Sequence, residues 1–309
     1  AQNMYRQVLA HDPASAGARD GLAHAERGLR PSTTFSLTHN GDNGGLRRNA
    51  GMVTHRWRSA AGNEIFEVEG RAVDDRLDPP GLAVRGRNGA IRYEDLDGPF
   101  APRWTLDFNS GAANGLFGGV RLRLEDGPTY LYLERLAWGV VALSPRALEL
   151  GQTALHVGLE TQQGFTYGSL YARASLYSVS DHNRVLSTAV RFSPWWRPLG
   201  LNFKPYVSLD TRDVKFNTIN YWSPAAGSGV ASLGLQGDWS GDDWYLSAAG
   251  QIGRPVYGEA GSVWSGSAAG KRWLSRDYAV GFNLWGMSSW RDGLNYRARS
   301  LNLTLEKLW

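Results

Sequence analysis

Apolar and polar side chains alternate with a period of two through most of this chain, from Thr33 to Trp309. In one example, the apolar Trp104, Leu106 and Phe108 are separated by hydroxyl and charged side chains. Successive side chains of a β-strand point to opposite faces of its sheet, so each such segment predicts a strand with one apolar and one polar face. We identify about 16 segments of this kind, each about 8 to 12 residues long, and no amphipathic helix among them. The pattern predicts an all-β domain.

The distribution of apolar residues leaves two kinds of all-β protein. No run of 18 apolar residues occurs, so the sequence predicts no transmembrane helix. A soluble sheet protein and a transmembrane β-barrel remain, because the alternating strands of a barrel are hydrophilic on average. The 13 Trp and 13 Tyr favour the barrel, since aromatic side chains form girdles at both surfaces of a bilayer, although carbohydrate-binding proteins share this bias.

Composition also excludes several classes of protein. The chain has no Cys, which excludes a disulfide scaffold and a Cys-ligated zinc site. The formal net charge of +4 comes from scattered charges of both signs, so no nucleic-acid partner is expected. The 38 Gly suit a protein with many turns and tight barrel corners.

The last segment, residues 300–309, has the features of a barrel-closing strand. Its apolar face holds Leu301, Leu303 and Leu305, and its polar face holds Asn302, Thr304 and Glu306. Trp309 ends the segment where such barrels carry an aromatic residue at the membrane interface. We expect the leucines to face lipid and the strand to pair with the first one, near residues 34–38. An edge strand of a soluble sheet is the alternative, and Lys307 stands where an apolar residue is common.

The connections between the predicted strands alternate between short and long. The short ones include 59–63, 125–128, 161–164, 240–243 and 275–277, and the long ones are 39–50, 73–88, 138–152, 210–229, 253–262 and 287–297. Short turns on the periplasmic side and long loops on the other are typical of outer-membrane barrels. We therefore predict a transmembrane antiparallel β-barrel of about 16 strands over residues 32–309, wide enough to hold an aqueous channel.

Residues 1–31 differ from the rest and are predicted to be a separate α-helical region. Tyr5, Val8 and Leu9 have helical spacing, Asp12-Pro13 interrupts the pattern, and Ala18, Leu22, Ala25 and Leu29 resume it. A generic helical hairpin is one interpretation. The first residues have the pattern expected in the middle of a helix, so we expect residues 1–31 to be the end of a longer helical region. An even number of strands places it and Trp309 on the same, short-turn side.

The polar faces of the strands would line the lumen and contact a transported molecule. The candidate contact residues are Glu67, Glu69, Asp107, Glu125, Glu160, Tyr167, Tyr171, Arg173, Tyr206 and Asp210. Opposite charges on neighbouring strands ordinarily pair and hold the wall rigid, which is the purely structural explanation for any one of these charges. The row of Tyr167, Tyr171 and Tyr177, with Ser between them, suits a sliding sugar polymer, because aromatic rings stack on the C–H faces of sugars.

No arrangement of residues predicts catalysis, so we expect no enzyme activity, no cofactor and no metal. The six His have no metal-ligand spacing, and the chain has neither a nucleophile elbow nor a phosphate-binding Gly loop. An outer-membrane barrel hydrolase is a minor alternative, with His156 and Glu160 or Asp181 and His182 as its candidate residues. The second pair is better explained as a turn, since Asp favours turns.

Two features resemble a known family. The form Tyr5-Arg-Gln-Val-Leu-Ala-x-Asp-Pro, followed by an Ala-rich helix containing Gly21-Leu-Ala, resembles the junction between two tetratricopeptide repeats. Such a tail joined to a barrel ending in Trp resembles the outer-membrane exopolysaccharide-export porins, which secrete poly-N-acetylglucosamine, cellulose or the Pel polymer. Asn220-Tyr-Trp-Ser-Pro looks like a segment of the poly-N-acetylglucosamine and cellulose porins, and the ending from Asp292 to Trp309 is closer to the poly-N-acetylglucosamine type.

This resemblance implies a function, a location and partners. The barrel would export a poly-N-acetylglucosamine-like exopolysaccharide through its lumen to the cell surface. It would lie in the outer membrane of a Gram-negative bacterium, in contact with outer-membrane lipid, with its N-terminal region in the periplasm. That region would bind a periplasmic polysaccharide-modifying enzyme. A general or substrate-specific diffusion porin is the alternative, and it gives no reason for a tetratricopeptide tail.

Overall fold

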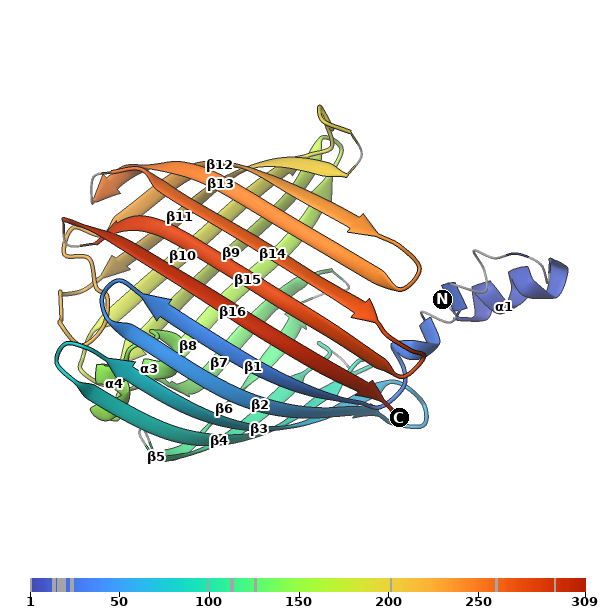
Figure 1. The fold of residues 1–309 in the computed structure, drawn as a ribbon, viewed down its shortest axis with the longest axis horizontal. Coiled ribbons are helices and arrows are strands. Elements are labelled where there is room, and N and C mark those ends of the chain that lie inside the picture. The colour runs from blue at the N-terminus through green and yellow to red at the C-terminus, as the bar shows by residue number, and fades with distance from the viewer. Residues whose placement is uncertain are drawn as a thin grey trace.

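The chain folds into a closed antiparallel barrel in which each strand pairs with the next and β1 pairs with β16 (Figure 1). The computed structural model describes residues 2–12, 15, 21–22, 25–98, 100–111, 114–124, 127–200, 202–258, 261–291 and 293–309. The strands are β1 Ser32–Asp42, β2 Leu46–Arg58, β3 Glu64–Leu77, β4 Leu82–Asp95, β5 Arg103–Gly111, β6 Gly115–Leu124, β7 Thr129–Ala137, β8 Thr153–Phe165, β9 Gly168–Val179, β10 Arg184–Pro194, β11 Phe203–Val214, β12 Ser228–Ser240, β13 Trp244–Gly258, β14 Val263–Trp273, β15 Tyr278–Arg291 and β16 Leu294–Leu308. The predicted barrel of about 16 strands is confirmed.

The closing strand pairs as expected. Residues 32–42 of β1 pair with residues 298–308 of β16, and Asn302 donates a hydrogen bond of 2.6 Å to the Thr38 hydroxyl inside the barrel. The Nε1 of Trp309 donates to the Thr33 hydroxyl at 2.8 Å. The Nζ of Lys307 lies 3.4 Å from the centroid of the Trp309 ring. Lys307 is therefore accommodated by a cation–π contact at the end of the last strand.

The two faces of the barrel wall have opposite character, as the alternation predicts. Large apolar side chains cover the outer surface, where Leu37, Leu233 and Ile252 are 67%, 65% and 70% exposed. Leu301, Leu303 and Leu305 are among these exposed side chains. Polar and charged side chains occupy the alternate positions and line the lumen. An exposed apolar band around a closed barrel suits a lipid bilayer, because the closed sheet satisfies its own backbone hydrogen bonds.

The connections differ from the predicted short–long alternation. We call the end of the barrel where β1 begins and β16 ends the near end, and the opposite end the far end. Turns at the near end, such as 59–63 and 274–277, are short, as expected. At the far end the connections 138–152 and 215–227 are long, but the prediction of long loops at the other far-end connections is wrong. Most of 73–88, for example, belongs to β3 and β4, which have 14 residues each because their alternation continues up to a tight turn. The expected turn 161–164 lies within β8, which turns only at residues 166–167.

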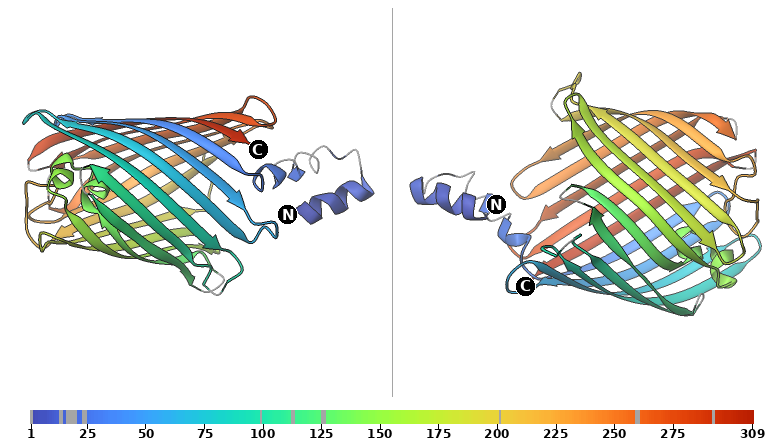
Figure 2. Two further views of the ribbon diagram at one scale, coloured as in Figure 1. Left: turned by 90° about the horizontal axis from the view of Figure 1, so that it is seen from below. Right: turned by 180° about the vertical axis from the view of Figure 1, so that it is seen from behind.

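A helix outside the barrel precedes β1 at the near end (Figure 2). This helix, α1 Gln2–His11, packs through Tyr5 on Gly21, where an added Cβ would lie 2.4 Å from the ring. Arg6 also forms an ion pair of 3.6 Å with Glu26. The described residues therefore place a second segment against α1, but the tetratricopeptide assignment stays a prediction, and Ala18 and Ala23 lie outside the described residues. Within the described part of the chain, no helix combines the length and apolar character that a membrane span needs.

Candidate functional site

An ion-pair network covers the lumen wall formed by β3 to β6. Arg92 donates to Glu67 at 2.5 Å and to Glu69 at 2.9 Å, and Arg121 donates to Glu94 at 2.6 Å. Two of the predicted contact residues, Glu67 and Glu69, thus lie in the lumen, but arginines hold their carboxylates. This wall is rigid and nearly neutral, which agrees with the structural explanation for charged ladders.

A hollow of about 620 Å³ lies along the opposite wall, on β8 to β13. It brings together the predicted residues Tyr171, Tyr206 and Asp210 with amide, hydroxyl and basic groups. Arg191 donates to Gln236 at 2.8 Å, and Lys204 donates to Asp238 at 2.6 Å. Only the second contact is an ion pair, because Gln236 is neutral, and Arg197 and Asp210 form no ion pair within 4.0 Å among the described residues. The hollow thus offers many hydrogen-bonding groups beside a few charges of both signs.

Tyr206 contributes less to this hollow than the sequence indicates. Tyr206 is 6% exposed, and its ring lies on Gly234, where an added Cβ would be 2.1 Å from the ring. The Arg191 guanidinium lies 3.6 Å from the ring centroid, and the hydroxyl donates to Gln251 at 3.2 Å. A ring covered by these neighbours cannot stack on a sugar. Tyr206 therefore stabilises the packing of its neighbours, while the ring of the half-buried Tyr171 remains accessible from the lumen.

The long connection between β7 and β8 folds into the far end of the lumen (Figures 1 and 2). It contains two short helices, α3 Trp138–Val141 and α4 Pro145–Glu149. Trp138 is 1% exposed and packs against Tyr177, with 5.1 Å between ring centroids. Leu148 packs in a cluster with Val84 of β4. Because β4 and β7 are separated by two strands, the connection spans part of the opening rather than lying over one strand.

The second long connection, residues 215–227, holds α3 and α4 in place. Tyr221 packs edge-on against Trp138, with 5.3 Å between centroids, and its hydroxyl donates to the Asp181 carboxylate at 3.0 Å. The Ser144 hydroxyl, at the start of α4, donates to the carbonyl of Asn220. Burial, with the Asp181 carboxylate nearby, raises the pKa of Tyr221 above its ordinary value of 10.0. The Asn220-Tyr-Trp-Ser-Pro segment thus joins the two far-end connections.

A second hollow, of about 600 Å³, continues the lumen beside this closure. It is lined by Arg173, Asp210, Arg212, Trp222, Trp285 and Arg291, among others. The Arg212 guanidinium lies 5.3 Å from the Trp222 ring centroid, and that of Arg291 lies 4.5 Å from it. Trp285 is 39% exposed. Trp285 is not among the contact residues predicted from the sequence, although extending the alternation of 278–284 by one residue places it on the lumen face.

Two of the candidate residues have a different position or lie outside the described part of the chain, and a third lies in the lumen as expected. Tyr167 is not in the lumen: it lies in the tight turn after β8 at the near end and is 82% exposed. The strand begins only at Gly168, which is why the expected Tyr row loses its first member. Glu125 lies outside the described residues. Asp107 is on the lumen face of β5, beside the network of Arg92 and Glu69.

The candidate hydrolase residues have structural partners. His156 is 3% exposed, bonds through Nδ1 to Glu134 at 2.9 Å and stacks on Tyr177. Glu160 instead accepts a hydrogen bond of 2.9 Å from Tyr132. Asp181 and His182 lie in the turn between β9 and β10, as expected. Among the described residues, no group of three His, Asp or Glu is placed to hold a metal ion.

Comparisons with known proteins show the fold of this chain. No protein-family model and no curated protein sequence matches it. A solved structure described as a bacterial polysaccharide outer membrane secretin has a TM-score of 0.69, with 14% identity over 91% of this chain and 99% of that one. A BenF-like porin from Pseudomonas fluorescens has a TM-score of 0.48 and 11% identity, over 91% of this chain and 98% of its own. OccK11 from Pseudomonas aeruginosa has a TM-score of 0.46 and 11% identity, over 91% and 96%. The chain thus shares the barrel fold of the first of these structures, an outer-membrane protein.

Proposed function

We propose that this chain is an outer-membrane porin that exports an exopolysaccharide through its lumen. The observation that carries the proposal is a path along β8 to β15. The hollow of about 620 Å³ and the hollow of about 600 Å³ share Ala189, Asp210 and Gln251 as lining residues, so they form one path past the far-end closure. The likeness in fold to a polysaccharide secretin supports this function over unselective diffusion.

The chemistry of this path suits a neutral sugar polymer. Its amide and hydroxyl groups can exchange hydrogen bonds with sugar hydroxyls, and Tyr171 and Trp285 supply ring faces for stacking. Its charged side chains are mostly basic, and the acid Asp238 is already paired with Lys204, so a cationic polymer would find few free carboxylates. Each contact is weak, and a polymer can therefore slide without being trapped. We infer an N-acetylated, poly-N-acetylglucosamine-like substrate.

The near end would face the periplasm and the far end the cell surface. Residues 1–31 would then belong to a periplasmic tetratricopeptide region that binds a polysaccharide-modifying enzyme. The polymer would enter at the near end, driven by its own synthesis, and leave past α3 and α4. The connection 138–152 is the gate in this proposal, because it lies inside the lumen and is held by side-chain contacts rather than by strand pairing.

Export in the source bacterium tests the function. Deleting the gene is expected to abolish surface polymer and to leave polymer in the periplasm, and restoring the wild-type chain is expected to reverse both effects. Measuring surface polymer and small-solute uptake in the same strains separates the two porin functions. Normal export together with impaired uptake of a small solute would contradict the proposal and favour the diffusion porin.

The gate can be tested in planar bilayers. The Trp138 N–H donates to the Gln152 carbonyl at 2.8 Å, so a short Gly-Ser linker can replace residues 140–150 while the ends of the connection stay together. This variant is expected to show a several-fold higher single-channel conductance. Replacing the far-end turn 78–81, which lies outside the lumen path, is the matched control and should change nothing. Equal conductance of both variants and the wild type would exclude 138–152 as the gate.

A further inference from the structure

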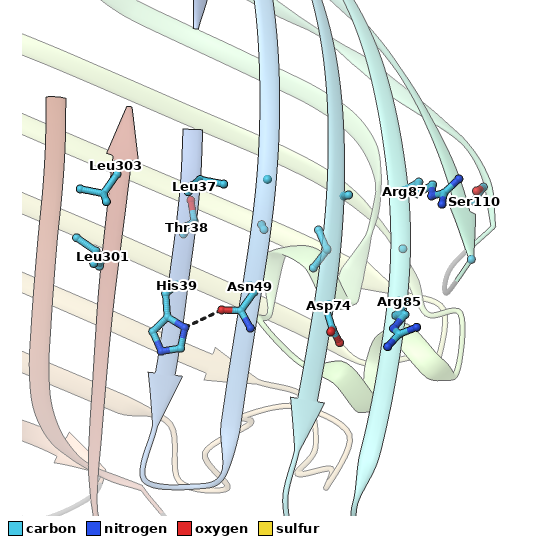
Figure 3. A pocket seen from close by; sticks show the side chains of 16 residues that line it. Leu37, Thr38, His39, Asn49, Asp74, Arg85, Arg87, Ser110, Leu301 and Leu303 are labelled. Atoms are coloured by element: carbon cyan, nitrogen blue, oxygen red, sulfur yellow. Dashed lines mark hydrogen bonds between the residues drawn. The ribbon is translucent and has the colours of Figure 1, made fainter. Parts of the chain in front are cut away.

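Polar side chains interrupt the apolar outer surface near the far end of β1 to β4 (Figure 3). Strand pairing places His39, Asn49, Asp74 and Arg85 in one row across these strands, with Arg299, Arg47 and Arg76 in the row nearer the rim and Arg87 in the row further from it. All five arginines are exposed. We call Arg47, Arg76, Arg85, Arg87 and Arg299 the arginine patch.

The arginine patch lacks matching negative charge. In the far half of these strands, Asp74 is the one acid among the described outward-facing side chains, and it pairs with Arg76 at 3.3 Å. Among the described residues, no carboxylate lies within 4.0 Å of the other four guanidinium groups. Cations on the lipid-facing side of a barrel are tolerated near the interface, where polar headgroups begin. Their position therefore leaves them open to an anion supplied from outside the protein.

A hollow of about 750 Å³ lies directly beside the arginine patch, on the same outer surface. Leu37, Leu301 and Leu303 form one side of it, and Arg85 and Arg87 form the other (Figure 3). Its floor between them is Gly51 and Ala72, which pair with each other on β2 and β3. The floor is thus shallow and apolar, with cations at one edge.

The chain does not need a glycine at Gly51 or at the neighbouring Gly70. An added Cβ at Gly51 would only touch Leu37 at 3.8 Å, and one at Gly70 would meet nothing within 4 Å. Glycine weakens a strand interior and often marks a place where a ligand approaches the backbone closely. A side chain at Gly51 would fill the hollow from its floor.

We propose that this surface binds one multiply acylated, phosphorylated glycolipid of the outer leaflet. Its phosphate would bind the arginine patch, because guanidinium groups form paired hydrogen bonds with phosphate oxygens. One acyl chain would lie in the hollow over Gly51 and Ala72, against the leucines. Charge complementarity favours this occupant over a second copy of the chain, whose own surface here would be equally positive.

The inference rests on the proposed orientation, in which the far end faces the outer leaflet. Lipid binding and polymer export are measured separately, so either proposal can fail without the other. Purified chain in detergent is titrated with bis-phosphorylated lipid A, and bound lipid is counted by native mass spectrometry. We expect one lipid bound per chain and at least tenfold weaker binding of dephosphorylated lipid A.

Variants of the two parts of the site make the test specific. The double variant Arg85→Gln/Arg87→Gln should weaken binding about tenfold, and Gly51→Leu should weaken it without lowering the unfolding temperature. The matched control is Arg184→Gln/Arg254→Gln, which removes two exposed, outward-facing arginines from β10 and β13. The proposal is overturned if the control loses as much affinity, if dephosphorylated lipid A binds equally well, or if inorganic phosphate alone displaces the lipid from wild type and Gly51→Leu alike.

Discussion

Trp285 and Tyr206 show how differently two aromatic side chains of the same lumen are placed. Tyr206 is held between Gly234 and the Arg191 guanidinium, so its ring packs within the barrel wall and is not open to the lumen. Trp285 is 39% exposed and has open ring surface in the path. An aromatic contact of this kind contributes about 1 kcal/mol, which corresponds to about a fivefold change in affinity. At the residue scale, ring accessibility rather than residue type decides which side chain can contact a polymer.

Replacing Trp285 with Ala should therefore weaken the contact between the lumen and an oligosaccharide. We expect about a fivefold loss in the affinity with which N-acetylglucosamine oligomers block the ionic current. Trp264→Ala is the matched control, because Trp264 is 51% exposed on the outer surface. The measurement is current block in planar bilayers. Equal losses in the two variants would show that the effect comes from barrel stability and not from the lumen.

A buried ion pair near the far end should matter more to stability than to transport. The Arg48 guanidinium donates two hydrogen bonds, of 2.7 and 2.5 Å, to Asp75, and the side chains are 8% and 0% exposed. Arg48→Met would leave the Asp75 charge buried and unpaired, at a cost of about 3 to 5 kcal/mol. The double variant Arg48→Met/Asp75→Leu should recover most of this loss. Urea unfolding in detergent measures both, and a double variant no more stable than Arg48→Met would contradict the argument.

At the scale of elements, the strands are predictable and the far-end closure is not. Alternation repeats locally, so the pairing of β1 with β16 follows from the alternation of Leu301, Leu303 and Leu305 and from the count of strands. Strand ends are less predictable. The sequence around Gln162 and Gly164 is typical of a turn, yet both residues pair with β9. The hydrogen bonds between the strands outweigh the weak local preference for a turn. Trp138 lies in the lumen because of contacts with Tyr177 and Tyr221, which are distant in sequence. No local pattern specifies such contacts, so the sequence predicts lumen charges but not the closure.

The contact between the two far-end connections should depend on pH through Tyr221. Its folded-state pKa is raised above 10.0, so its burial stabilises the closure below about pH 10, and this contribution is lost as the pH rises further. The difference in tyrosinate absorbance between wild type and Tyr221→Phe during alkaline titration isolates this group. We expect its midpoint above pH 10. A midpoint at or below that value would mean that the phenol is not held by burial next to Asp181.

At the scale of the whole molecule, the barrel combines an outer arginine patch, which has little matching negative charge, with a lumen in which many acids are paired. In the lumen, Arg92 pairs with Glu67 and Lys271 pairs with Glu306, whereas Arg212 and Arg291 lie against the Trp222 ring. Acids that are already paired attract a cationic polymer only weakly. The paired acids are the reason to expect selection by hydrogen bonding and ring stacking rather than by attraction of a cationic chain.

This pairing predicts which form of an amino-sugar polymer the lumen prefers. N-acetylated oligomers should block the channel at least as well as deacetylated, cationic oligomers of the same length, because many of the lumen carboxylates are already paired. The affinity with which the N-acetylated oligomers block the channel should also change less than about twofold between about 0.1 M and about 1 M salt, although the higher concentration largely screens interactions between exposed charges. Current block by the two oligomer series at both salt concentrations makes the comparison. Much tighter block by the cationic series at low salt, lost at high salt, would instead identify an acidic path, with carboxylates such as Asp210 available to the polymer.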